Sequence, residues 1–261
     1  MKLGKKINIL TLIIFLLTMS FSLASCAEAP LPEKTRIMCY GDSNTWGWMP
    51  VENIPTTRYA SNVRWTGVLQ KELGDKYQVV EEGLNGRTTG ADDYANGLDE
   101  SITKDLNLNG RPTLLPILKS QLPLKLVVIM LGTNDVKTYL NQEPAQIADS
   151  MQKLVTLVNT SVKKETEWDD YSVPRVLIVA PTPVRKGISA GLNELFAGGD
   201  KPSAQLGKLY AEVAKATGAE FFDASTIIPV ADGADGIHLT AEAHNKLGLA
   251  LAEKIKTILK K

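Results

Sequence analysis

The sequence is poor in histidine and cysteine and carries no net charge. Only two of its 261 residues are histidine and two are cysteine. These are too few for the clusters typical of transition-metal sites, so we expect neither a metal nor another cofactor. Its 29 basic and 29 acidic side chains balance, so no long-range field favours nucleic acid or an acidic surface. Without repeats or low-complexity blocks, the chain has the length and apolar content of one α/β domain. The adjacent carboxylates of Asp92 and Asp93 are interpreted as a solvated pair.

The N-terminal segment has the layout of a secretory signal. Three lysines precede an apolar run from Ile7 to Leu23, and small residues then lead into a cysteine. The stretch Leu23–Cys26 resembles the bacterial lipobox, whose cysteine is lipidated and becomes the mature N-terminus. We therefore expect a lipoprotein signal peptide over residues 1–25, a proline-bearing tether over 26–34 and the folded domain over 35–261.

On this interpretation the two cysteines have separate uses. Cys26 carries lipid and attaches the protein to a membrane, while Cys39 is a small buried hydrophobic residue of the first strand. A disulfide between them is possible on redox grounds. An uncleaved anchor helix and plain secretion are alternatives to the lipoprotein signal. All three place the folded domain outside the cytoplasm.

Strand-like and helix-like segments alternate along the rest of the chain. The run Leu126–Leu131 is apolar at every position, which is typical of a strand buried on both faces. Strands are predicted at Arg36–Tyr40, Tyr77–Glu81, Leu126–Leu131, Arg175–Ala180 and Glu220–Asp223, and helices at Trp65–Leu73, Leu114–Gln121, Ile147–Val162, Ala204–Thr217 and Ala241–Leu259. This alternation predicts an α/β domain with a parallel sheet and helices on both faces. The Gly-rich segment Val184–Pro202 is the best candidate for a mobile lid or a substrate loop.

A serine follows the first predicted strand, on a turn that begins with glycine. The stretch Gly41–Gly47 reads GDSNTWG. The turn would expose the hydroxyl of Ser43 at the carboxyl end of the strand, where open α/β sheets bind ligands. The same residue types also suit a plain turn with helix-cap residues, so the motif alone is ambiguous.

Three further polar segments follow later strands. Gly83–Gly90 lacks the dinucleotide-binding spacing, but its glycines allow a backbone N–H to approach a ligand; it also suits an ordinary βα turn. Asn134, after the most buried strand, is either a side-chain N–H donor or a helix N-cap. Asp235 can fix one imidazole nitrogen of His238 and leave the other free, or the two can be a loop pair without function. The other histidine, His244, is predicted on a solvated helix surface.

These segments can converge. The carboxyl ends of parallel strands meet at one edge of the sheet, and the last loop can return to the same edge. That arrangement would bring together a nucleophile, a general base with its orienting carboxylate, and donors for an oxyanion. These are the parts that acyl transfer requires.

The motifs GDSNTWG, NGRTTG, GTND and DGIHLT resemble, in order, the four sequence blocks of the SGNH (GDSL-type) hydrolase family. Trp46 and the Arg-Thr-Thr that begins at Arg87 are similar to its arylesterase or acyltransferase branch. The resemblance spans the whole mature domain. It implies a flavodoxin-like three-layer α/β/α fold with a five-stranded parallel sheet, and metal-free hydrolysis of esters. The family's substrates range from acetylated sugars to phospholipids, so the resemblance does not choose among them; we expect a small-molecule or glycan ester.

The resemblance also implies roles for individual residues. Ser43 would be the nucleophile, His238 the base and Asp235 its partner. The backbone N–H groups of Ser43 and Gly86 and the side chain of Asn134 would form the oxyanion hole. Three neighbouring residues are further candidates for substrate contact: Asp42, Trp46 and Arg87.

Two alternatives remain. Gly187–Gly191 fits the G-x-S-x-G esterase motif with Ser189 as nucleophile, although no strand directly precedes it. A lipoprotein that only binds carbohydrate could instead stack sugars on Trp46, Trp48 or Trp65. The acyl length, the alcohol, the balance of hydrolysis and acyl transfer, and the oligomeric state stay open, with short acyl groups favoured.

Overall fold

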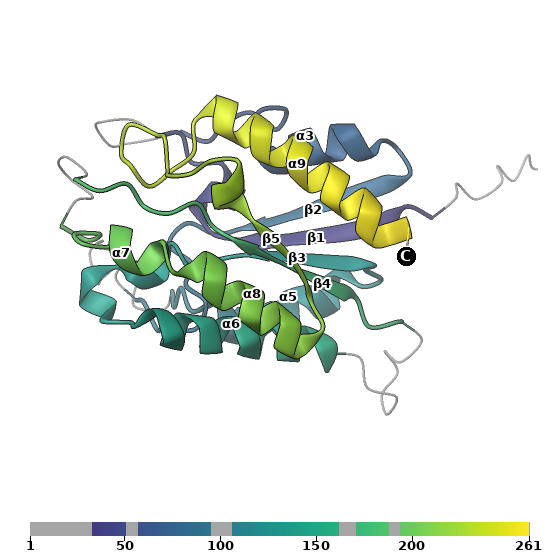
Figure 1. Ribbon diagram of the computed structural model, residues 1–261. Coiled ribbons are helices and arrows are strands. Elements are labelled where there is room, and N and C mark those ends of the chain that lie inside the picture. The colour runs from purple at the N-terminus through teal and green to yellow at the C-terminus, as the bar shows by residue number, and fades with distance from the viewer. Residues whose placement is uncertain (1–32, 51–56, 95–105, 162–170, 188–193, 261) are drawn as a thin grey trace, which may run out of the picture. The chain divides into compact units, whose positions relative to one another are not determined.

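The computed structural model describes residues 33–50, 57–94, 106–161, 171–187 and 194–260 (Figure 1). Five parallel strands form its sheet in the spatial order β2-β1-β3-β4-β5. They are β1 (Thr35–Gly41), β2 (Tyr77–Gly83), β3 (Leu126–Met130), β4 (Arg175–Ala180) and β5 (Glu220–Asp223). Each predicted strand is therefore present, within two residues at either end.

The position of β3 in the sheet explains its composition. It pairs with β1 on one side and β4 on the other, and all five of its residues are buried. After β1 the chain places β2 on one side of it and β3 on the other. The strand order therefore reverses beside β1, and the crevice beyond the carboxyl ends of β1 and β3 is where such sheets bind ligands.

Helices cover both faces of the sheet, with α3 and α9 on one and α5, α6 and α8 on the other (Figure 1). Alternate side chains of β1 point to opposite faces of the sheet. Met38 and Tyr40 pack in one hydrophobic cluster, and Ile37 and Cys39 pack in the other. The α-helices are α2 (Ser43–Trp46), α3 (Trp65–Leu73), α5 (Gly110–Gln121), α6 (Pro144–Asn159), α7 (Asp200–Ser203), α8 (Leu206–Thr217) and α9 (Ala241–Lys260). The predicted three-layer α/β/α fold with a flavodoxin-like strand order is confirmed.

Two helices begin earlier than the hydrophobic pattern predicts, because of capping. The side chain of Asn109 accepts the N–H of Arg111, so α5 starts at Gly110. Glu143 and Gln146 form a reciprocal capping box ahead of α6. The helix predicted at Ala204–Thr217 is preceded by a separate short turn of helix, α7.

The described part of the chain contains no helix long and apolar enough to cross a membrane. The predicted signal peptide, Cys26 and most of the predicted tether lie outside the described residues. Ser189 also lies outside them. Cys39 is a free, buried thiol within β1, as predicted.

Candidate active site

Ser43 lies on a sharp turn at the carboxyl end of β1. The strand ends at Gly41, Asp42 caps α2 by accepting a backbone N–H at 2.9 Å, and Ser43 is the first residue of the helix. Only glycine fits at position 41, since a Cβ there would lie 2.0 Å from Oγ1 of Thr45. The close packing of the turn places Ser43 at the ligand-binding edge of the sheet.

The imidazole of His238 links Ser43 to Asp235. Its Nε2 lies 2.8 Å from Oγ of Ser43, and its Nδ1 lies 2.7 Å from Oδ2 of Asp235. The other carboxylate oxygen of Asp235 accepts the N–H groups of Ile237 at 3.0 Å and His238 at 2.9 Å. Burial raises the pKa of Asp235, but these hydrogen bonds outweigh it and hold that pKa below its ordinary value. The ionised carboxylate thus orients an imidazole whose other nitrogen faces a hydroxyl.

A tryptophan covers one face of this imidazole. The ring of Trp48 stacks on His238, with centroids 5.2 Å apart and planes at 19°. Trp48 in turn lies 6.4 Å from Trp46, whose ring carries the guanidinium of Arg58 at 5.1 Å. The family resemblance draws attention to Trp46, whereas the ring that contacts the imidazole belongs to Trp48, two residues further on.

The loop after β2 brings a backbone turn to the same edge. The N–H of Leu84 donates to Gly41 at 3.1 Å, and the N–H of Arg87 closes the turn on Leu84 at 3.1 Å. Gly86 has φ of 81°, as the third residue of a type II turn requires. The side chain of Asn134 donates to the carbonyl of Arg87 at 3.2 Å, so the loops after β2 and β3 are joined.

Asn134 does not cap a helix with its side chain. It is the first residue of the short 3₁₀ helix η1 (Asn134–Val136), and Thr133 occupies the N-cap position. The helix-cap alternative is therefore wrong. One proton of the Asn134 amide bonds to the neighbouring loop, and the second is left for another acceptor.

The sequence model of the GDSL-like lipase/acylhydrolase family matches residues 39–246, a range that includes Ser43, Asn134, Asp235 and His238. The chain belongs to this family. The family match and the similar esterase structures show that this acylhydrolase is a carboxylic ester hydrolase. The predicted family resemblance is confirmed. A comparison with curated proteins gave no match.

Solved structures of esterases are similar to this acylhydrolase over most of its length. Est24, a carbohydrate acetylesterase from Sinorhizobium meliloti, is 41% identical with a TM-score of 0.77, covering 86% of this chain and 100% of Est24. The M. smegmatis aryl esterase is 42% identical with a TM-score of 0.76, covering 85% and 99% of the two chains. A carbohydrate acetylesterase family member from S. meliloti is 35% identical with a TM-score of 0.75, covering 87% and 100%.

Two of the residues considered for substrate contact are directed into the protein. The side chain of Arg87 is buried, its guanidinium donates to the carbonyls of Gly41 and Glu82, and it lies 4.0 Å from the ring of Tyr40. Asp42 is 1% exposed, and burial raises its pKa to about 6. Both side chains therefore support the turn under Ser43, which corrects the expectation that they face substrate. Trp46 is partly exposed, and its contact with substrate stays a prediction.

Three other interpretations are also corrected by burial. His244 is fully buried, and its Nδ1 accepts the N–H of Trp65 at 3.2 Å, so it is not a solvated surface residue of α9. Asp93 is buried and pairs with Lys137 at 2.8 Å, although its neighbour Asp92 is exposed as expected. Trp65 is 0% exposed and cannot stack on a sugar.

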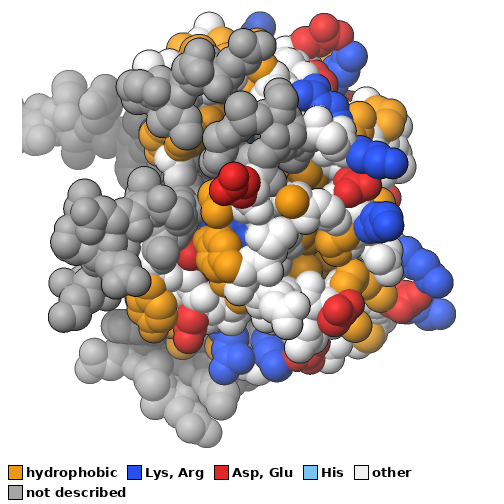
Figure 2. Space-filling view, turned by 90° about the vertical axis from the view of Figure 1, so that its left-hand side faces the viewer, with side chains coloured by type: hydrophobic (Ala, Val, Ile, Leu, Met, Phe, Trp, Pro, Cys, Tyr) orange, Lys and Arg blue, Asp and Glu red, His pale blue; other side chains and the backbone are white. Residues whose placement is uncertain are grey.

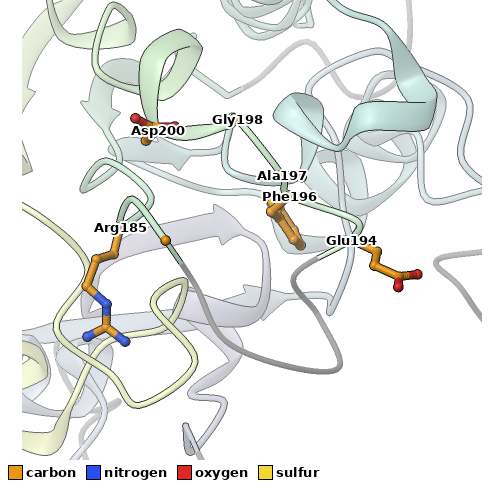
Figure 3. A pocket seen from close by; sticks show the side chains of 7 residues that line it. Arg185, Glu194, Phe196, Ala197, Gly198 and Asp200 are labelled. Carbon is orange, nitrogen blue, oxygen red and sulfur yellow. The ribbon is translucent and has the colours of Figure 1, made fainter.

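A cavity of about 340 Å³ lies along the segment that was predicted as a substrate loop. Figure 3 shows Arg185 and Glu194 on opposite sides of it, with the ring of Phe196 between them. The N–H of Arg185 donates to Gly236 and its guanidinium to Ala234, both at 2.9 Å. One wall of the cavity is therefore bonded to the loop that carries Asp235 and His238.

The end of the molecule that bears the carboxyl ends of the strands is seen in Figure 2. Hydrophobic side chains and white atoms, which are uncharged side chains and backbone, occupy most of the centre of the described surface, with Asp and Glu side chains among them, and most Lys and Arg side chains lie towards its edge.

Proposed function

We propose that this acylhydrolase is a serine esterase that releases short acyl groups, acetyl first, from a small-molecule or glycan ester. The hydrogen-bonded series Ser43, His238 and Asp235, with separations of 2.8 and 2.7 Å, is the observation that carries the proposal. A hydroxyl, an imidazole and a carboxylate in this order are the groups that activate a serine nucleophile. All three side chains are at least nine-tenths buried, which strengthens their mutual interactions.

In the proposed mechanism, neutral His238 accepts the Ser43 proton as Oγ attacks the ester carbonyl. The carbonyl π electrons move to oxygen, and the oxyanion accepts hydrogen bonds from the N–H groups of Ser43 and Gly86 and from the amide of Asn134. Asp235 stabilises the imidazolium. His238 then returns the proton to the leaving alcohol, and an acyl-enzyme remains. Water, or another alcohol, attacks this ester with His238 again as base, which releases the acid or a new ester.

The alcohol portion is proposed to be polar, with sugars as the main class. Arg185, Glu194 and Asp200 line the cavity beside the Asp235–His238 loop, and carboxylate and guanidinium groups suit the hydroxyl groups of a sugar. The similarity to carbohydrate acetylesterases favours the same class, while the similarity to an aryl esterase favours short aryl esters as additional substrates.

We also propose that the enzyme acts outside the cytoplasm, attached to a membrane by lipid on Cys26. This proposal rests on the sequence of residues 1–34 and on the position of the fold, whose first strand begins at Thr35, directly after the predicted tether.

The experiment measures acid release by purified wild type and Ser43→Ala from three substrate classes: acetylated glycans, short aryl esters and lysophospholipids. We expect wild type to release acetate from the first two classes, and Ser43→Ala to release none. Fatty-acid release from lysophospholipids alone would overturn the short-acyl assignment. Absence of acyl release from all three classes would favour the carbohydrate-binding alternative.

A further inference from the structure

Two short segments of different loops are bonded together beside the proposed oxyanion hole. One is residues 87–89 of the loop after β2, and the other is the dipeptide Asn134-Asp135 after β3. Asn134 donates to the carbonyl of Arg87 at 3.2 Å. Two residues further along, the N–H of Thr89 donates to both oxygens of Asp135, at 3.0 and 2.9 Å, and the Thr89 hydroxyl donates to Oδ1 at 2.5 Å.

The mechanism proposed above makes no use of Asp135, yet its carboxyl group is 1% exposed. A buried carboxylate is costly unless it is well hydrogen-bonded. Here the three bonds to Thr89 recover part of that cost, although burial still raises the pKa of Asp135 to about 6, and Thr89 is itself 0% exposed. This buried carboxylate therefore holds one loop residue, Thr89, which lies three positions after Gly86.

We propose that Asp135 is a positioning residue that holds the Gly86 N–H and the Asn134 amide at the separation an oxyanion requires. This inference rests on the proposed function, in which those two groups are donors. Asp135 is covalently adjacent to Asn134 and hydrogen-bonded to the loop of Gly86, so one side chain fixes both donors relative to each other. Preorganised donors stabilise the transition state because they need not reorient during the reaction.

The substitution Asp135→Asn tests this with almost no change in shape. The amide has one acceptor oxygen, and its NH₂ would lie about 2.9 Å from the Thr89 N–H, donor against donor. The donors should then lose their fixed separation. Removing one donor outright typically costs about 10²–10³ in kcat. We therefore expect kcat to fall at least about 10-fold and KM to change little, because the contact acts in the transition state.

Phenylboronic acid separates positioning from a merely structural role. It forms a tetrahedral adduct with a serine nucleophile and places an oxygen where the oxyanion would lie. Its dissociation constant should rise by the same factor as kcat falls. Asp223→Asn is the matched control: this carboxylate also accepts a backbone N–H after a strand, from Ser225 at 2.9 Å, but at the far end of the strand order. It should leave both quantities unchanged.

A second pair of variants decides the matter if Asp135→Asn does not fold. Thr89→Val removes only the hydroxyl bond to Asp135 and should lower kcat and phenylboronate affinity by about 3- to 10-fold, the value of one such bond. Thr89→Ser keeps the hydroxyl and should restore both. Equal kcat and affinity in wild type, Thr89→Val and Thr89→Ser would overturn the inference.

A double-mutant cycle identifies the route of the effect. If Asp135 acts through the oxyanion hole, Asp135→Asn should cost less in an Asn134→Ala background than in wild type. Wild-type kcat and phenylboronate affinity in Asp135→Asn, with only a lower melting temperature, would make Asp135 purely structural. Those results would leave the proposed function intact, since that function is tested separately, by acyl release from wild type and Ser43→Ala on the three substrate classes.

Discussion

The indole of Trp48 lies against the imidazole of His238, with ring centroids 5.2 Å apart and planes at 19°. Hydrogen bonds to Ser43 and Asp235 fix the imidazole within its plane, and the indole fixes its tilt and covers one face from water. Such aromatic pairs are worth about 0.5–1.5 kcal/mol. Trp48→Ala should therefore lower kcat/KM by about 2- to 10-fold, measured on a short aryl acetate.

Trp48→Phe is the control for this prediction. A phenyl ring can keep the stacked face, so most of the loss should be recovered. If Trp48→Ala turns over as fast as wild type, the stacked ring has no part in orienting His238.

The two serine motifs make opposite predictions about the nucleophile. The hydroxyl of Ser43 faces His238 at 2.8 Å, whereas Ser189 lies outside the described residues. A fluorophosphonate should label wild type and Ser189→Ala at equal rates and should leave Ser43→Ala unlabelled. Labelling of Ser43→Ala but not of Ser189→Ala would assign the reaction to the G-x-S-x-G motif instead.

The five strands and the four polar segments could be predicted because each depends on local pattern, whereas the flavodoxin-like arrangement was expected only from the family resemblance. A fully apolar run such as that of β3 indicates a buried strand, and a glycine-initiated turn after a strand indicates a ligand-binding edge. Contacts between distant residues could not be predicted this way. Asp93 pairs with Lys137, which lies 44 residues further along the chain, and no local sequence pattern indicates that these two residues meet.

The hydrophobic pattern of α9 indicates that His244 is buried, although its polarity led to the opposite prediction. It precedes Leu247 and Leu251 by three and seven residues, which places it on the buried stripe of α9. A buried imidazole needs a hydrogen-bond partner. The N–H of Trp65 supplies it, because a backbone N–H at the start of a helix has no acceptor within that helix. The role of Trp48 was missed for a different reason, since its stacking depends on how the chain continues after α2.

His244 should make folding stability depend on pH. Burial lowers its pKa from 6.5 to about 4, because only the neutral ring can accept the Trp65 N–H and remain buried. The unfolded chain binds a proton below pH 6.5 and the folded chain does not, so this contribution is full above about pH 6.5 and is lost towards pH 4. The loss amounts to about 3 kcal/mol.

The contribution of His244 is measured as a difference between two proteins. Burial raises the pKa of both Asp42 and Asp135 to about 6, which changes stability in the opposite sense over part of this range. His244→Asn can keep an acceptor near the Nδ1 position without titrating. Urea unfolding from pH 7 to pH 4 should show the variant gaining stability relative to wild type as the pH falls. A constant difference would contradict the assigned pKa. Wild-type esterase activity is expected in His244→Asn, and none in His238→Ala.

The proposed lipid anchor is tested through Cys26. Expressed with its own signal in a bacterium, the protein should incorporate labelled fatty acid and partition into detergent. Cys26→Ala should lose the label, whereas Cys39→Ala should keep it, because Cys39 is buried in β1. Continued acylation of Cys26→Ala would exclude the lipobox interpretation.

The amide of Asn134 has two possible roles, which one variant separates. It donates to the carbonyl of Arg87 at 3.2 Å, and its second proton is free for an oxyanion. If the bond to Arg87 is its whole role, Asn134→Ala should cost about 1 kcal/mol of folding stability and leave turnover almost intact. If the amide also stabilises the oxyanion, kcat should fall by about 10²–10³. KM should then change little, since the ground-state carbonyl hardly uses the donor. Measuring kcat, KM and melting temperature on the same preparation distinguishes the two. A variant that melts earlier but turns over at the wild-type rate would remove Asn134 from the oxyanion hole.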